Sequence, residues 1–250
     1  MPLQPLSPQR LYRQIADQLR ALIERGEFPP GTRLPPERDL AVQLGVSRPS
    51  VREALIALEV EGRVEVRMGS GIYVRESPAR AAAVHEAESP LETIRARALI
   101  EGELAAQAAQ RMKRAQLGGL REAIALMVQE SAAGQTPTQG DRLFHTRIAE
   151  ASDNSVLLRV VSELFDERHN PLFEQLGSHF ENARSWAIAI EEHKAVVDAI
   201  ARQDPAAARE AMVRHLANSH DRFMASWPAE GEAPAKTPGK PAPRKRKATA

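Results

Sequence analysis

Residues 28–74 read FPPGTRLPPERDLAVQLGVSRPSVREALIALEVEGRVEVRMGSGIYV. This stretch has two helical patterns, over about 36–44 and 48–61, and a glycine follows each of them, as is common at helix C-termini. Two helices joined by a short turn that contains glycine form a helix-turn-helix. One more amphipathic helix is expected before them, over about 8–26.

The apolar pattern changes its period to two after Gly62. Apolar residues recur at alternate positions over 64–66 and 72–74, on either side of the sequence Gly69-Ser70-Gly71. This pattern predicts a β-hairpin with a glycine-rich tip. A hairpin that follows a helix-turn-helix is the wing of a winged helix, so we predict that residues 8–76 form a winged helix-turn-helix domain that binds DNA.

The rest of the chain has the composition of a second, helical domain. A chain of 250 residues is too long for one small module. Because aromatic residues make up only 4%, the core must consist mainly of Leu, Ile, Val and Ala, which favours packed helices. Residues 91–227 contain about six amphipathic segments, near 91–112, 114–133, 140–151, 155–176, 181–202 and 205–226. The expected fold class is therefore mainly α, an N-terminal winged helix followed by an all-helical bundle.

Two segments have little to bury, and we expect a linker over 77–90 and a disordered basic tail over 228–250.

No apolar run approaches the roughly 20 residues that cross a bilayer, and the N-terminus lacks the pattern of a secretion signal. We therefore expect a cytoplasmic protein that makes no membrane contact. The absence of cysteine excludes disulfides, thiolate zinc sites and a cysteine nucleophile.

The second helix of the predicted helix-turn-helix begins with side chains that suit DNA. Ser47, Arg48, Ser50 and Arg52 lie in its first turn and a half, and Arg38 lies in the preceding helix. An arginine fork matches the acceptors of guanine in the major groove, and the N-terminus of such a helix meets phosphate. Each arginine alone is equally well explained as a solvated surface residue. The motif, the wing and the arginines together indicate DNA binding.

Four ionisable residues of the second domain lie on apolar helix faces. Asp141 and His145 are one helical turn apart, and His193 and His215 each share a face with aliphatic residues. Buried imidazoles and carboxylates need partners. One explanation is a divalent transition metal such as Zn²⁺ or Ni²⁺, for which these are suitable ligands. The other is three separately hydrogen-bonded core histidines, and the pattern alone does not decide between them.

The first domain resembles the winged-helix domain of the GntR regulators. The resemblance is carried by residues 28–41, by Leu44-Gly-Val-Ser-Arg-Pro-Ser-Val-Arg-Glu-Ala-Leu55 and by Gly69-Ser-Gly-Ile-Tyr-Val74. It implies that Arg38, Arg48 and Arg52, with Ser47 and the wing tip around Gly69, contact double-stranded operator DNA. It also implies a homodimer on a near-palindromic operator.

The second domain is similar to the helical effector domain of the FadR branch of this family, through residues 141–154, 192–200 and 212–216. In members that contain a metal, the positions of Asp141, His145, His193 and His215 bind the ion, which holds a carboxylate effector. The resemblance also implies that Arg97, in Arg97-Ala-Leu-Ile-Glu101, reaches this carboxylate, a pair with good bidentate geometry.

Residues 168–173 and 176–180, with the wing, look like those of the hexuronate-utilisation repressors, which respond to sugar acids such as fructuronate, glucuronate and galacturonate. His169 and Asn170 are then candidate donors to sugar hydroxyls. The alternative is that His169-Asn170-Pro171 forms only a local cap or kink. The basic tail is a departure from that group.

These features favour a metabolite-responsive transcriptional regulator, a repressor of hexuronate catabolism genes that leaves its operator when a carboxylate effector binds. One alternative keeps the regulator and changes the effector to a smaller acid such as lactate or pyruvate, or removes the metal. The other is a metal-dependent hydrolase, since a metal at Asp141, His145, His193 and His215 would activate water. An enzyme is disfavoured because the sequence singles out no general base and an arginine-rich winged helix would have no purpose there.

Overall fold

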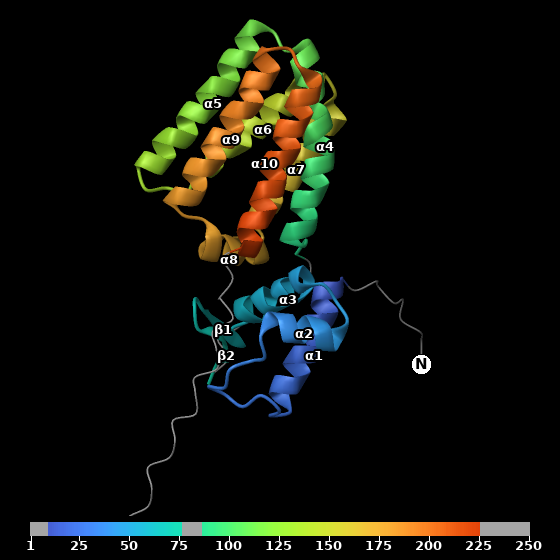
Figure 1. The fold of residues 1–250 in the computed structure, drawn as a ribbon, viewed down its shortest axis with the longest axis vertical. Coiled ribbons are helices and arrows are strands. Elements are labelled where there is room, and N and C mark those ends of the chain that lie inside the picture. Colours follow the sequence, from blue (N-terminus) through green and yellow to red (C-terminus); the bar gives the residue numbers. More distant parts are fainter. Residues whose placement is uncertain (1–9, 77–86, 226–250) are drawn as a thin grey trace, which may run out of the picture.

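The computed structural model describes residues 10–76 and 87–225, arranged as a small N-terminal domain below a long helical bundle (Figure 1). The N-terminal domain has the order α1 (Leu11–Glu24), α2 (Glu37–Leu44), α3 (Arg48–Val60), β1 (Val64–Arg67) and β2 (Gly71–Val74). The predicted winged helix-turn-helix is therefore present. The helix expected over 8–26 is observed from Leu11, and residues 8 and 9 lie outside the described part of the chain.

Local signals explain these elements. The side chain of Ser47 caps α3 by accepting a hydrogen bond from the backbone N–H of Ser50. Gly45 ends α2 with a φ of 65°, in the left-handed region that favours glycine. In the wing, β1 pairs antiparallel with β2, with Val64 opposite Val74 and Val66 opposite Ile72, and all four side chains are buried against the helices.

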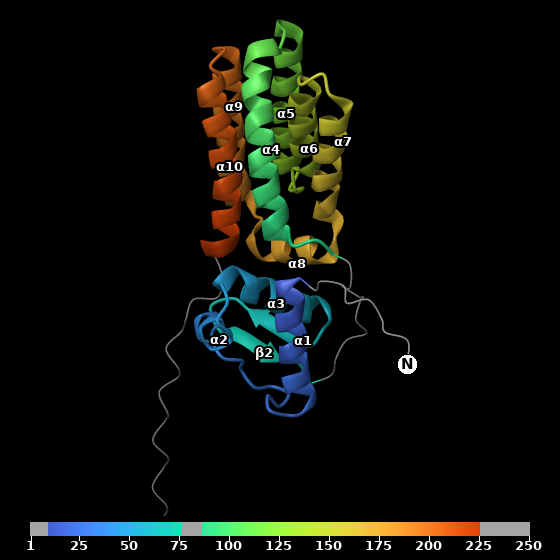
Figure 2. The same cartoon turned by 90° about the vertical axis from the view of Figure 1, so that its right-hand side faces the viewer.

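The second domain is an all-helical bundle, as predicted. Its helices are α4 (Pro90–Arg111), α5 (Arg114–Ala132), α6 (Thr138–Glu150), α7 (Ser155–Asp166), α8 (Pro171–Phe180), α9 (Ala183–Ala201) and α10 (Pro205–Ala225), with a short 3-10 turn over Glu167–His169. Most of them run along the long axis, and α4 and α10 lie side by side (Figure 2). Helix α8 instead crosses the lower end of the bundle, where it faces α3 (Figures 1 and 2).

The helix predicted over 155–176 is wrong in its extent, because the structure divides it at Asn170. A residue before proline avoids the helical conformation, and Asn170 has φ −73° and ψ 148° in front of Pro171. Gly177, which falls in the gap between the predicted segments 155–176 and 181–202, lies inside α8, so the gap predicted there is also wrong. The result is a separate helix that turns across the end of the bundle.

Most of the predicted linker and all of the predicted basic tail, over 77–86 and 228–250, lie outside the described residues. Within the described ranges, no helix is both long enough and apolar enough to cross a membrane.

We predict that Gly140→Ala destabilises the bundle. A Cβ atom at Gly140 would lie 2.6 Å from the backbone nitrogen of Met127 and 2.8 Å from the carbonyl oxygen of Ala123, so α6 would have to move away from α5. Overpacking of this kind costs about 1–3 kcal/mol in the free energy of unfolding, which denaturant titration measures. The control is Gly118→Ala, where a Cβ meets nothing within 4 Å and should stabilise α5 slightly. Equal effects of the two changes would contradict the prediction.

Candidate metal centre and DNA interface

The structure brings together the four residues that the sequence predicts as metal ligands. Asp141 and His145 come from α6, His193 from α9 and His215 from α10, and all four are buried. One potential ligand atom from each lies within 4.8 Å of those of the other three. Helices α6, α9 and α10 therefore bring a carboxylate and three imidazoles close together.

Each imidazole of the cluster is held through its Nδ1 atom. His145 is paired with Glu101 Oε2, His193 with the carbonyl oxygen of Ala189 at 2.7 Å, and His215 with Glu192 Oε2 at 2.9 Å. Hydrogen bonds at Nδ1 orient imidazoles whose Nε2 atoms bind metals.

On the inner side, His193 Nε2 lies 3.0 Å from Asp141 Oδ1 and 3.3 Å from His145 Nε2. His145 Nε2 lies 3.5 Å from the same carboxylate oxygen. The Nε2 atoms of His145 and His193 thus both face Asp141, and the ligand atoms of all four residues are close enough together for one metal ion to bind them. The donor set fits Zn²⁺ or Ni²⁺.

Burial and neighbouring charges set the protonation of the cluster. Burial lowers the pKa of His215 to about 3, so this imidazole is neutral at physiological pH and has a lone pair for a metal. Burial alone would raise the pKa of Asp141, but hydrogen bonds from His145 and His193 outweigh it and hold this pKa well below its usual value. Burial also opposes protonation of His145, yet the charge of Glu101 raises its pKa. Metal binding at His145 Nε2 would require loss of the proton that this atom carries in the charged imidazole.

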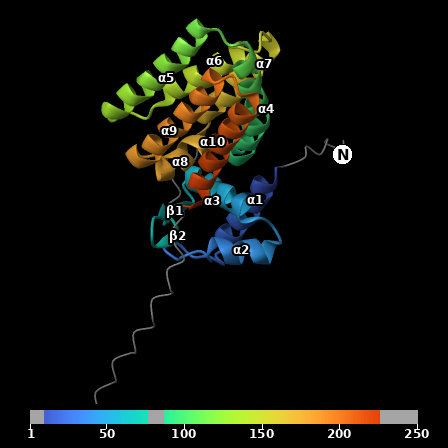
Figure 3. The same cartoon turned by 45° about the horizontal axis from the view of Figure 1, so that its top comes forward.

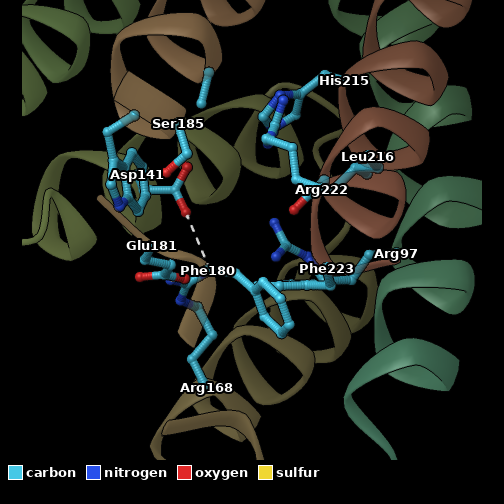
Figure 4. Close-up of a pocket in the computed structure, with 13 residues that line it drawn as sticks. Arg97, Asp141, Arg168, Phe180, Glu181, Ser185, His215, Leu216, Arg222 and Phe223 are labelled. Atoms are coloured by element: carbon cyan, nitrogen blue, oxygen red, sulfur yellow. Dashed lines mark hydrogen bonds and ion pairs between the residues drawn. The ribbon is translucent and has the colours of Figure 1, made fainter. Parts of the chain in front are cut away.

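A cavity lies directly beside the cluster (Figure 4). Asp141, Glu181 and Ser185 line one side of it, and His215 and Arg222 line the other. Its volume of about 40 Å³ is room for a few water molecules, so a larger ligand requires side chains to move. The other lining residues are Arg97, Arg168, Phe180, Trp186, Ala189, Leu216, Ser219 and Phe223.

Arg97, the predicted carboxylate contact, lines the cavity beside the cluster. Its side chain is 3% exposed, and its Nε donates to Glu101 Oε1 at 2.6 Å. The Nη2 atom of Arg97 is buried and has no hydrogen-bond partner within residues 10–76 and 87–225. Glu101, which the sequence did not single out, therefore connects the cavity arginine to the cluster imidazole of His145.

The other two predicted effector contacts lie elsewhere. His169 is exposed and lines a separate groove of about 570 Å³. Asn170 caps α8: its Oδ1 accepts from the N–H of Phe173 at 2.8 Å and its Nδ2 donates to Glu167 at 3.0 Å. The sequence left two interpretations of Asn170, a donor to sugar hydroxyls or a local cap, and in the structure it is a cap. Arg168 and Glu181, joined by an ion pair of 2.6 Å, line both the groove and the cavity beside the cluster.

Most residues predicted to contact DNA are accessible. The side chains of Arg38 and Arg48 are 62% and 52% exposed, and Ser47 is exposed at the start of α3. Ser50 is partly exposed in the first turn of α3, and Gly69 lies at the exposed tip of the wing with φ 73°. These residues come from α2, α3 and the wing, the parts of the domain that the sequence assigns to the DNA-facing surface.

Arg52 is the exception, because its side chain is completely buried. Its Nε donates to Glu37 Oε2 at 2.9 Å, and its Nη1 donates to the carbonyl oxygen of Phe223 at 2.6 Å. The end of α10 thus covers Arg52, and the predicted DNA contact of this residue is incompatible with this arrangement of the two domains. Glu37, a second residue that the sequence did not single out, also accepts from Arg48 at 3.1 Å.

Other contacts hold the outer side of α3 against the bundle (Figure 3). Glu53 accepts a hydrogen bond from the backbone N–H of Leu91 at 3.0 Å, at the start of α4. Glu59 Oε2 lies 2.7 Å from His179 Nε2 on α8. All residues from Val51 to Leu58 are buried, so α3 is enclosed between α1 and the bundle.

Comparison with known proteins covers both domains. Residues 11–74 match the family model of bacterial regulatory proteins of the gntR family, and residues 92–218 match the FCD domain. The chain is 37% identical over 227 residues to the Uxu operon transcriptional regulator of Escherichia coli K12, covering 87% of this chain and 88% of that protein. It is 38% identical over 224 residues to the Exu regulon transcriptional regulator of the same organism, covering 85% and 84%.

Among solved structures, a GntR protein of Streptococcus agalactiae is 25% identical and covers 84% of this chain and 99% of its own, with a TM-score of 0.47. The two family models account for both domains, and the relatives match along most of their length. The chain therefore belongs to the GntR family of DNA-binding transcriptional regulators, with a C-terminal FCD domain.

Proposed function

We propose that this regulator binds operator DNA as a homodimer, holds a divalent metal at Asp141, His145, His193 and His215, and leaves the operator when a sugar acid enters the adjacent cavity. The observation that carries the effector site is the buried cluster beside Arg97, whose Nη2 atom lacks an acceptor in the described part of the chain. When bound, the metal would supply positive charge for the acid's carboxylate. Arg97 would add a second positive group, fixed in place by Glu101.

The resemblance to hexuronate-utilisation repressors supports a hexuronate as the acid, as do the Uxu and Exu names of the relatives. Smaller acids such as lactate and pyruvate are the competing effectors. A hydrolase would need a carboxylate that can act as general base. It is disfavoured because the carboxylates near the cluster have other roles: Glu101 and Glu192 each hold an imidazole, and Glu181 is paired with Arg168.

We propose that the arrangement seen here is the form that does not bind DNA. Burial of Arg52 removes a side chain that the family resemblance assigns to operator contact. Helix α10 connects this contact with the effector cavity, because Arg222 and Phe223 line the cavity and the Phe223 carbonyl accepts from Arg52. We call the arrangement seen here, with Arg52 buried under α10, the closed form. An effector that fixes the end of α10 would favour this form, so effector binding would weaken operator binding.

The metal assignment predicts that His193→Ala abolishes metal binding. The wild-type protein should hold about one divalent ion per protomer. The variant, which lacks one of the four protein ligands, should hold almost none. Elemental analysis of dialysed protein measures this, and thermal unfolding with and without a chelator gives an independent readout. His220→Ala on α10 is the control, since His220 pairs with Asp221. Full metal content in His193→Ala would show that the histidines form only a hydrogen-bonded core.

The DNA interface predicts that Arg48→Ala weakens operator binding by about 5- to 100-fold, the range expected for one arginine contact to a base. Fluorescence anisotropy on the protein's own upstream region measures this affinity. Arg159→Ala is the control, because Arg159 is an exposed arginine on α7.

The same titration of the wild-type protein, repeated with fructuronate, glucuronate, galacturonate, lactate and pyruvate, tests the effector. Release by one hexuronate at micromolar to millimolar concentration is expected. Operator binding that no acid alters would exclude the proposed effector class.

The closed form predicts that His179→Ala raises the effector concentration needed for half-release of DNA. The change removes the contact between α8 and Glu59, and loss of one hydrogen bond of about 0.5–1.5 kcal/mol corresponds to about 2- to 12-fold. Ser178→Ala is the matched control, since the Ser178 hydroxyl donates to Gln175 within the same helix. If both variants respond like the wild type, contact between α3 and α8 has no part in release.

A further inference from the structure

Two buried donors of residues that line the cavity have no acceptor among the residues that the structure describes. One is Arg97 Nη2, and the other is the indole Nε1 of Trp186, whose residue is 8% exposed. Both residues line the cavity beside the cluster. A buried donor without a partner is costly and uncommon in folded proteins, so each is expected to meet an acceptor from outside the protein, either water or a ligand.

The position of Trp186 on α9 indicates how far this ligand extends. Trp186 precedes His193 by seven residues, so the two lie on the same face of the helix about 10 Å apart along its axis. The carbonyl of Ala189, between them, accepts from His193 Nδ1. Because their backbone positions are two turns apart, we expect a ligand that contacts both the cluster and the indole to be longer than a three-carbon acid.

The surroundings of Trp186 are polar as well as aromatic. The guanidinium of Arg168 lies 5.8 Å from the centre of its ring and pairs with Glu181 at 2.6 Å. The hydroxyl-bearing residues Ser185 and Ser219 also line the cavity. These groups exceed what one carboxylate requires, and they suit a ligand with several hydroxyls.

We infer that Trp186 is a specificity-determining residue that recognises the end of the effector opposite its carboxylate. Its Nε1–H donates to a hydroxyl or carbonyl oxygen of the acid, while the carboxylate lies at Arg97 and the cluster. The inference rests on the proposed function and assigns the ligand class as carboxylic acids of more than three carbons with an oxygen acceptor at the far end. Hexuronates belong to this class, whereas lactate and pyruvate do not.

The test is Trp186→Phe in the full chain, which keeps an aromatic ring and removes the donor. Isothermal titration of metal-loaded protein with the three hexuronates, and with hexanoate as an acid of similar length without hydroxyls, gives the affinities. We expect the tightest hexuronate to lose about 10-fold in affinity, as for one hydrogen bond, and hexanoate to be unaffected. Metal content serves as the check that the variant is intact.

A second measurement leaves Trp186 unchanged. The chain has two tryptophans, so Trp227→Phe makes Trp186 the sole source of indole fluorescence. We expect a spectral change with the active hexuronate and none with lactate. Equal losses for hexuronate and hexanoate in Trp186→Phe, or unchanged hexuronate affinity, would overturn the inference alone. A wild-type protein that neither binds a hexuronate nor releases DNA in its presence would instead overturn the proposed function, and the inference with it.

Discussion

The buried carboxylate of Glu101 organises the interior of the second domain. One of its oxygens accepts from Arg97 and the other is paired with His145, and both residues of this carboxylate–imidazole pair are 1% exposed. A buried charge is tolerated only when it is paired and hydrogen-bonded. Burial raises the pKa of Glu101, but Arg97 and His145 outweigh it and bring the value to about 2. The carboxylate is therefore ionised, and it fixes both a cavity residue and a candidate metal ligand.

The same physical rule accounts for the contact between the domains. The side chain of Arg52 is completely buried, so its donors need acceptors from the protein. Glu37 of the same domain and the Phe223 carbonyl of the bundle provide them. The exposed side chain of Arg48 binds the other oxygen of Glu37. Separation of the domains would remove the Phe223 carbonyl from Arg52 and leave Glu37 shared between two arginines. The arginine that joins the two domains is thus one that the family resemblance assigns to operator contact.

Local signals allowed much of this structure to be predicted. The helix-turn-helix and wing follow from caps and glycines that act within a few residues, and the four cluster residues follow from helical periodicity, which shows that they face inward. Periodicity failed where backbone chemistry opposed it, at Asn170 before Pro171. It also could not show that Arg52 is buried, because Arg52 is covered by residues 171 positions away. Trp186 has no sequence signal as a donor, since its missing partner is visible only in three dimensions.

Helix α10 contributes residues both to the proposed effector site and to the contact with the DNA-binding domain. His215 belongs to the cluster, Arg222 lines the cavity two turns later, and the next residue, Phe223, accepts the hydrogen bond of Arg52. Glu192 of α9 connects these two parts of α10, because one of its carboxylate oxygens pairs with His215 and the other accepts from Arg222. A ligand that displaces or fixes Arg222 therefore acts on one residue of the interface through its neighbour in the chain. In the proposed mechanism the two sites are coupled because α10 forms part of both.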